Sequence, residues 1–288
     1  MSRVSGLRPE QIDFYRDEGY LQLDELFDPK RGMDLLRAEL DEIVNLGARA
    51  AHAEGLLSDL FEQEPFERRL ASIAAALDEP SELLGRVGGK LRTPGMFAIL
   101  TEPAILDVIE SLIGPEILAH PQFNIRAKLP HQDRGVVPWH QDLAYLQPDA
   151  EETFMVNFWI PLVNATVENG CMEVMPRSHG TLVEHVENIG PGQNFRGVLD
   201  ENLPPGEHVP CPVKVGGALL IQHKTLHRST PNLSDHIRWS LDLRYSDPAW
   251  PTGRDGVPGF IARSAQDPSS VARSVEDWDR IMDGATAS

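Results

Sequence analysis

The chain contains only two cysteines, Cys171 and Cys211, among its 288 residues. Two cysteines provide neither a disulfide framework nor a cysteine-rich zinc site, and they are typical of a reducing compartment, so a cytoplasmic location is expected. No run of about 18 apolar residues occurs, which argues against a membrane-spanning helix. The first residues, MSRVSGLRPEQ, lack the apolar segment of a secretory signal.

Positive charge is also scarce, with 26 Lys and Arg against 44 Asp and Glu and a formal net charge of −18. An acidic chain repels the phosphates of nucleic acids and the headgroups of anionic membranes. The composition therefore argues against both as partners and favours a small-molecule ligand. Hydrophobic residues make up 41% of the chain, enough for a sizeable core.

The first part of the chain is expected to be mostly helical. RPEQIDFYRDEGY places Pro9 early and Gly19 late, the usual asymmetry of helix ends. YLQLDELF alternates like a strand, and DPKRGMDLLRAELDEIVNLGARA then has leucines at helical spacing. Residues 48–86, rich in Ala, Leu and Glu, and TEPAILDVIESLIGPE, closed by Gly114, are predicted to be helical as well.

From about residue 116 the chain reads as short strands separated by turn residues. The runs are EILAHPQFNIRAKL, VVPWHQDLAYL, TFMVNFWIPLV, CMEVMP, VKVGGALLIQ and IRWSLDLRY. Many short strands with turns between them are typical of a sandwich or barrel. The order predicts one α+β domain, mainly β, with helices packed outside a barrel. Residues 247–264 are expected to form an ordered loop across the mouth of the barrel. Together with the helices at 48–86, this loop is expected to form the wall of the substrate pocket.

The tripeptide His-Gln-Asp occurs twice, at 131–133 and at 140–142. In a strand, residues i and i+2 point to the same face and can converge on one metal ion. The first copy lies between Pro130 and Gly135 and has the composition of a turn. The second lies in VVPWHQDLAYL, so His140 and Asp142 are the predicted ligands.

A third ligand is expected from the segment after GGALLI, which holds His223 and His227. Arg238 follows His227 by eleven residues, on a strand whose alternate positions are Arg238, Ser240, Asp242 and Arg244. If Arg238 points into a barrel, it needs an anionic partner, because an unpaired buried charge is costly. The partner is either a bound dicarboxylate or an internal acid.

Two histidines and one carboxylate leave three positions open on an iron ion, as in non-haem Fe(II) oxygenases. Zinc hydrolases also use two histidines and a carboxylate, but the helical HExxH motif is absent. A jelly-roll protein that binds a metal or ligand without turnover is the alternative from another class. Iron-dependent release of succinate from 2-oxoglutarate separates these hypotheses.

Four segments in this order resemble the phytanoyl-CoA dioxygenase family of Fe(II)/2-oxoglutarate oxygenases: LRPEQIDFYRDEGYLQLDELF, PWHQDLAYL, NGCMEVMPRSHG and LHRSTPNLSDHIRWSLDLRY. The resemblance implies a double-stranded β-helix, or jelly roll, within a single domain over 1–288. It divides the chain into a helical part at about 1–115, a jelly-roll core at about 116–250 and a C-terminal loop and tail at 251–288. It also implies Fe(II), 2-oxoglutarate and O₂ as cofactor and cosubstrates.

By the same resemblance, His140, Asp142 and His227 match the iron ligands, and Arg238 matches the arginine that grips the distal carboxylate of 2-oxoglutarate. The other matching cosubstrate contacts are Ser229, Trp159 in MVNFWIPL and Lys90 in GGKLRTPG. Asn124 in QFNIRAKL falls within one residue of a further family contact, and a one-residue slip would turn it to the other face. Core packing is the alternative for Trp159, and a surface position is the alternative for Lys90.

One residue departs from the family pattern, and one residue that matches it narrows the chemistry. Arg177 stands where the family usually has glycine, and His179 in the same motif is expected to be structural. Asp142 is present, whereas halogenating relatives replace this carboxylate by a small residue, so hydroxylation of an aliphatic C–H or a related oxidation is expected. No basic cluster suits the phosphates of coenzyme A, although Arg254 and Arg263 are candidates for a smaller anion.

Overall fold

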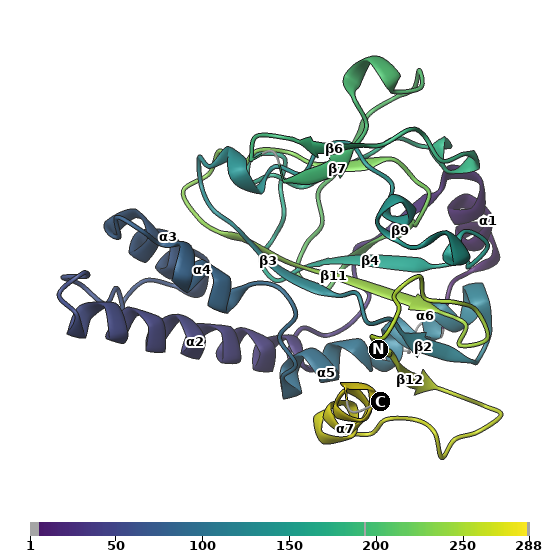
Figure 1. Cartoon of the computed structure of the whole chain (residues 1–288), viewed down its shortest axis with the longest axis horizontal. Helices are drawn as coiled ribbons and strands as arrows, with labels where there is room; N and C mark the ends of the chain where they lie inside the picture. Colours follow the sequence, from purple (N-terminus) through teal and green to yellow (C-terminus); the bar gives the residue numbers. More distant parts are fainter. Residues whose placement is uncertain (1–5, 193, 287–288) are drawn as a thin grey trace.

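The computed structural model describes residues 6–192 and 194–286. Its centre is a seven-stranded sheet in the order β1-β9-β4-β11-β2-β12, with β3 also pairing with β11 (Figure 1). The strands are β1 (Tyr20–Leu23), β2 (Ile117–Ala119), β3 (Asn124–Lys128), β4 (Val156–Pro161), β9 (Ala218–Gln222), β11 (Arg238–Ser246) and β12 (Phe260–Arg263). All their pairings are antiparallel.

Two smaller sheets face the large one. They consist of β10 (His227–Ser229), β5 (Met172–Val174) and β8 (Val209–Cys211), and of β6 (Val186–Ile189) with β7 (Phe195–Gly197). A cavity of about 350 Å³ lies between the sheets, because its lining comes from β3, β4 and β11 on one side and from β5, β7 and β10 on the other. The β6-β7 hairpin lies above this space in Figure 1.

Helices cover the other face and the ends of the large sheet (Figure 1). They are α1 (Pro9–Glu18), α2 (Met33–Ala53), α3 (Phe66–Ala76), α4 (Ser81–Val87), α5 (Pro94–Leu100), α6 (Pro103–Ile113) and α7 (Val275–Thr286). In Figure 1, α2, α5, α6 and α7 lie below the sheet, α3 and α4 at the left and α1 at the right. One hydrophobic cluster runs from Tyr15 in α1 to Trp278 in α7. None of the described helices is both long and apolar enough to cross a membrane.

The sequence pattern explains why these helices pack where they do. The buried residues of α2 recur every three or four positions, which places them on one stripe of the helix: Met33, Leu36, Leu40, Val44 and Ala48. The helices α1 and α6 end at the predicted glycines, Gly19 and Gly114, both at positive φ, where a side chain would be strained.

Strand β11 has two chemically different faces, as the alternation of its sequence predicts. Trp239, Leu241, Leu243 and Tyr245 belong to the hydrophobic core. Arg238, Asp242 and Arg244 line the cavity. Because successive side chains of a strand point to opposite faces, β11 contributes one set of residues to the packed core and the other set to the polar cavity.

Two predictions of local structure are wrong. Residues 136–139 form no strand, because Pro138 has no N–H to donate to a ladder and Val137 N donates to the Ser229 hydroxyl. The segment 247–264 does not form a wall of the cavity: none of its residues line it, and it ends in strand β12, which pairs with β2. Of the predicted helical wall at 48–86, α4 contributes Leu84.

Candidate active site

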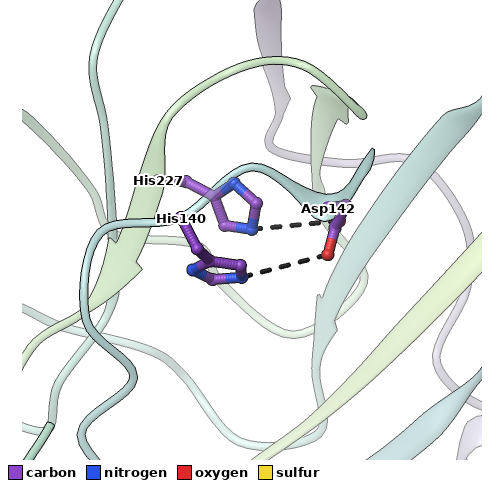
Figure 2. Close-up of side chains that lie close together, drawn as sticks. All are labelled: His140, Asp142 and His227. Carbon is purple, nitrogen blue, oxygen red and sulfur yellow. Dashed lines mark ion pairs between the residues drawn. The ribbon is translucent and has the colours of Figure 1, made fainter. Parts of the chain in front are cut away.

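Three side chains predicted as metal ligands converge in the cavity between the sheets (Figure 2). One ligand atom from each of His140, Asp142 and His227 lies within 4.8 Å of the others. Each histidine Nε2 is 3.9 Å from an Asp142 carboxylate oxygen. That spacing is shorter than twice a metal–ligand bond of roughly 2.0 to 2.2 Å, so one ion fits between the atoms.

The two imidazole rings are held in the tautomer that a metal requires. His140 Nδ1 lies 2.9 Å from Pro138 O, and His227 Nδ1 lies 2.9 Å from Thr225 O. A carbonyl only accepts, so both Nδ1 atoms carry hydrogen and both Nε2 lone pairs face Asp142. Burial lowers the pKa of His140 to about 3, with repulsion from His227 adding to it, so the ring is neutral at pH 7.

The backbone brings the two histidines together. His140 and His227 form an isolated antiparallel β-bridge, with N–O distances of 3.0 Å in both directions. Asp142 then begins a 3-10 turn, Asp142–Tyr145, which directs its carboxylate back towards the rings. The ligands are those the sequence predicts, but a bridge followed by a turn, rather than a strand, places them.

Gln141, between the two ligands, fixes this bend. Its side-chain amide donates to Thr181 O and Lys224 O, and its side-chain oxygen accepts from Val183 N. Gln141 is completely buried. The middle residue of the His-Gln-Asp motif therefore ties the ligand segment to two other loops.

The Asp142 carboxylate is held from the large sheet. Arg244 of β11 donates to Oδ1, and Asn157 of β4 donates to Oδ2. Arg244 and Asn157 are paired in the sheet register, so they approach together. Burial raises the pKa of Asp142, but the positive charge of Arg244 and its hydrogen bond oppose this, and the net shift is downwards. The group is therefore an ionised carboxylate, as a metal ligand must be.

Arg238 lies elsewhere in the same cavity, 2% exposed. Its guanidinium lies 5.3 Å from the centre of the Trp159 ring, donates from Nε to Gly170 O at 3.2 Å and from Nη1 to Ser240 Oγ at 2.6 Å. No carboxylate of the described residues forms an ion pair with it. Burial lowers the pKa of Arg238 to about 10, with Asp242 opposing the shift. It remains a cation at pH 7.

Gly170 explains part of the NGCMEVMP motif. It has φ +84°, and a Cβ there would lie 2.5 Å from Thr230 O. Only glycine fits this position, and its carbonyl is the one that orients Arg238.

Ser229 and Lys128 complete the wall beside Arg238. Ser229 Oγ accepts from Lys128 Nζ at 2.8 Å and from Val137 N at 3.0 Å. Lys128 also donates to Thr230 O, and it is the register partner of Arg238 across β3 and β11. Both Lys128 and Ser229 are buried and line the cavity.

The remaining candidates lie outside this group. Lys90 is exposed and does not line the cavity, and Asn124 lies on β3 opposite Asp242, also away from the lining. His131 sits on an exposed turn at φ 53°, in agreement with the prediction for the first His-Gln-Asp copy. His223 is buried, but it is not part of the described ligand group.

Other predicted positions are accounted for structurally. Arg177 adopts the left-handed conformation, φ 61°, that glycine favours. His179 Nε2 lies 3.0 Å from Arg16 O. Arg263 forms ion pairs with Asp107 and Glu110, so its charge is already compensated.

Three residues of the site, Lys128, Arg244 and Asn157, have no role that the sequence alone predicts. The alternation of NIRAKL and VNFWIP places them on one face of their strands, but those patterns do not say which strand lies opposite. The pairing of β3 and β4 with β11, far along the chain, turns these residues towards the metal site and Arg238.

Comparisons with known proteins agree with this site. The family model "Phytanoyl-CoA dioxygenase (PhyH)" matches residues 15–240. "Phytanoyl-CoA dioxygenase domain-containing protein 1" of Rattus norvegicus is 31% identical over 180 residues, 59% of this chain and 60% of that protein. Its Danio rerio namesake is 27% identical over 289 residues, 88% of this chain and 97% of the relative.

A further relative and one solved structure extend the comparison. The "Probable alpha-ketoglutarate-dependent hypophosphite dioxygenase" of Stutzerimonas stutzeri is 28% identical over 248 residues, covering 84% of this chain and 80% of the relative. The solved "non-heme monooxygenase; ThoJ apo" superposes with a TM-score of 0.61 at 20% identity, over 96% of this chain and 93% of that chain. The predicted enzyme class, an Fe(II)- and 2-oxoglutarate-dependent dioxygenase that uses O₂, is confirmed. The chain belongs to the phytanoyl-CoA dioxygenase family.

Proposed function

We propose that the chain hydroxylates an aliphatic C–H bond of a small molecule, with His140, Asp142 and His227 as the iron ligands. The main support for this proposal is that the triad shares one cavity with Arg238, a buried cation that forms no ion pair among the described residues. A buried charge without a partner is costly, and a ligand carboxylate removes the cost.

In this proposal Arg238, Ser229 and Trp159 hold the distal carboxylate of 2-oxoglutarate. Arg238 uses one N–H on Gly170 O and one on Ser240 Oγ, which leaves three of its five donors. Trp159 supports the guanidinium face and fixes its plane. Lys90 and Asn124 stay predicted cosubstrate contacts, and each requires a movement towards the cavity.

When bound, Fe(II) with 2-oxoglutarate and O₂ supplies the oxidising power: one oxygen atom enters the C–H bond, the other enters succinate, and CO₂ leaves. The chain's own residues orient these partners. Arg244 and Asn157 keep the Asp142 carboxylate ionised and in position. The apolar lining, which includes Leu84, Phe195 and Met172, keeps bulk water out and leaves space for an apolar part of the substrate.

The proposal also covers the architecture and location. We take the facing sheets as the double-stranded β-helix implied by the family and residues 1–288 as one domain, supported by the cluster that joins α1 to α7. A cytoplasmic location rests on the two unpaired cysteines.

The test is iron-dependent succinate release. Protein with Fe(II), 2-oxoglutarate and O₂ is expected to release succinate above the level of the Asp142→Ala variant, and Zn²⁺ should inhibit, since it competes for the same ligands. A folded wild type that releases no more succinate than Asp142→Ala would support the non-catalytic binding protein. Activity restored by zinc would support a hydrolase.

A further inference from the structure

The charges lining the cavity are unevenly paired. Six charged side chains line it: Arg126, Lys128, Asp142, Arg238, Asp242 and Arg244. Arg126 pairs with Asp242, and Arg244 pairs with Asp142. Two basic side chains, Lys128 and Arg238, are left without an ion pair to any described acid, and they are neighbours in the sheet register.

Lys128 is far more buried than a lysine usually is, at 3% exposed. An ammonium has three N–H donors. Two of them are used, on Ser229 Oγ at 2.8 Å and on Thr230 O. In the ammonium form the third N–H remains for a ligand in the cavity that Lys128 lines.

The Lys128 contact also determines what Ser229 can do. A hydroxyl accepts two hydrogen bonds and donates one. Lys128 Nζ and Val137 N occupy both acceptor positions, and among the described residues the Ser229 proton has a single acceptor, Gly135 O at 3.4 Å. This distance is long for a hydroxyl donor. The Ser229 proton is therefore available to an anion.

We infer that Lys128 is a second cation of the cosubstrate site, which binds the distal carboxylate together with Arg238 and directs the Ser229 hydroxyl towards it. The site then selects a 2-oxo acid that carries a second carboxylate over one that ends in a methyl group. This inference rests on the proposed function, because it concerns the same cosubstrate.

Electrostatics agree with the geometry. Burial lowers the pKa of Lys128 to about 6, and repulsion from Arg238 and Arg126 adds to the shift, while the Cys171 thiol opposes it. The site without ligand thus disfavours the second positive charge. A bound carboxylate supplies the opposite charge and favours the ammonium form.

The experiment compares two ligands that differ only at the distal end. Anaerobic Fe(II) protein is titrated with 2-oxoglutarate and with 2-oxopentanoate, and the metal-to-ligand charge-transfer band reports binding of each. In Lys128→Gln and Lys128→Met, affinity for 2-oxoglutarate should fall at least about tenfold, whereas affinity for 2-oxopentanoate should change less than about threefold. Lys214→Met, on an exposed position outside the cavity lining, is the matched control and should leave both affinities unchanged.

The two ligands separate the possible outcomes. Equal weakening of both in the Lys128 variants would show that Lys128 only supports packing, and an unchanged affinity for 2-oxoglutarate in folded Lys128→Gln would also overturn the inference. If Lys128→Met fails to fold, the test rests on Lys128→Gln, because this variant retains an N–H donor. A wild type that shows no band with either ligand contradicts the proposed function itself, not this inference alone.

Discussion

Arg238→Ala isolates the contribution of one guanidinium to cosubstrate binding. The side chain is buried, lies against Trp159 and has three donors left for a ligand. Hydrogen bonds to charged groups contribute roughly 1.5 to 3 kcal/mol each, so losing a bidentate pair costs about 3 to 6 kcal/mol. Because Lys128 and Ser229 remain, the lower end applies, and about 1.4 kcal/mol per decade gives roughly a hundredfold weaker binding.

The assay is a titration of 2-oxoglutarate into the anaerobic Fe(II) protein, followed by the charge-transfer band. Fe(II) affinity should change less than about threefold, because Arg238 does not touch the ligand triad. Arg238→Lys should recover only part of the loss, since an ammonium lacks the planar fork. If Arg238→Ala melts like the wild type and still binds 2-oxoglutarate within about threefold, under roughly 1 kcal/mol, then Arg238 is a structural residue.

Three further predictions concern the metal ligands and the buried lysine. His140→Ala should abolish Fe(II) binding in anaerobic calorimetry, while His131→Ala, on an exposed turn, should bind like the wild type; equal losses in folded variants would mean that the wrong copy was chosen. His227→Ala should lose the metal, whereas His223→Gln should keep Fe(II) affinity within about threefold, because His223 is outside the ligand group; a reversed order contradicts the assignment. Lys128→Met should stabilise the metal-free protein against urea more at pH 7 than at pH 9. The folded pKa of Lys128, about 6, lies below the unfolded value, so the cost of burying the amine shrinks as pH rises. If the gain in unfolding free energy were the same at both pH values, the lowered pKa would be contradicted.

The sequence predicted the strands and helices whose periodicity is strong. The sequence predicts strand β11 because apolar and polar residues alternate through it. It predicts α2 because the leucines of this segment recur at helical spacing. The β6-β7 hairpin is not predicted by the sequence, since VENI and FRG are short and apolar and polar residues do not alternate clearly in either. Strand β12 is not predicted by the sequence, because the glycines and prolines around it are typical of a loop.

At the site, residue types were easier to predict than geometry. His140 and Asp142 were identified from a two-residue spacing, but the same spacing suits a bridge followed by a 3-10 turn. The partners of these ligands come from distant strands: Arg244 reaches Asp142 across 102 positions of sequence, and Lys128 reaches Ser229 across 101. A one-residue change of register would turn each of them away, and register depends on the whole sheet.

The three hydrogen bonds of the Gln141 side chain have a consequence for how the metal arrives. They hold the segment between His140 and Asp142 against the loops at Thr181–Val183 and Lys224 without help from an ion. The ligands therefore lose little conformational freedom when a metal binds, and little of the binding free energy goes into ordering the chain. A chelator should remove the ion and leave the fold intact, unlike a zinc finger, whose folding depends on its metal. Iron loss then becomes a reversible event, and the protein can be reloaded after synthesis or oxidation without passing through an unfolded state.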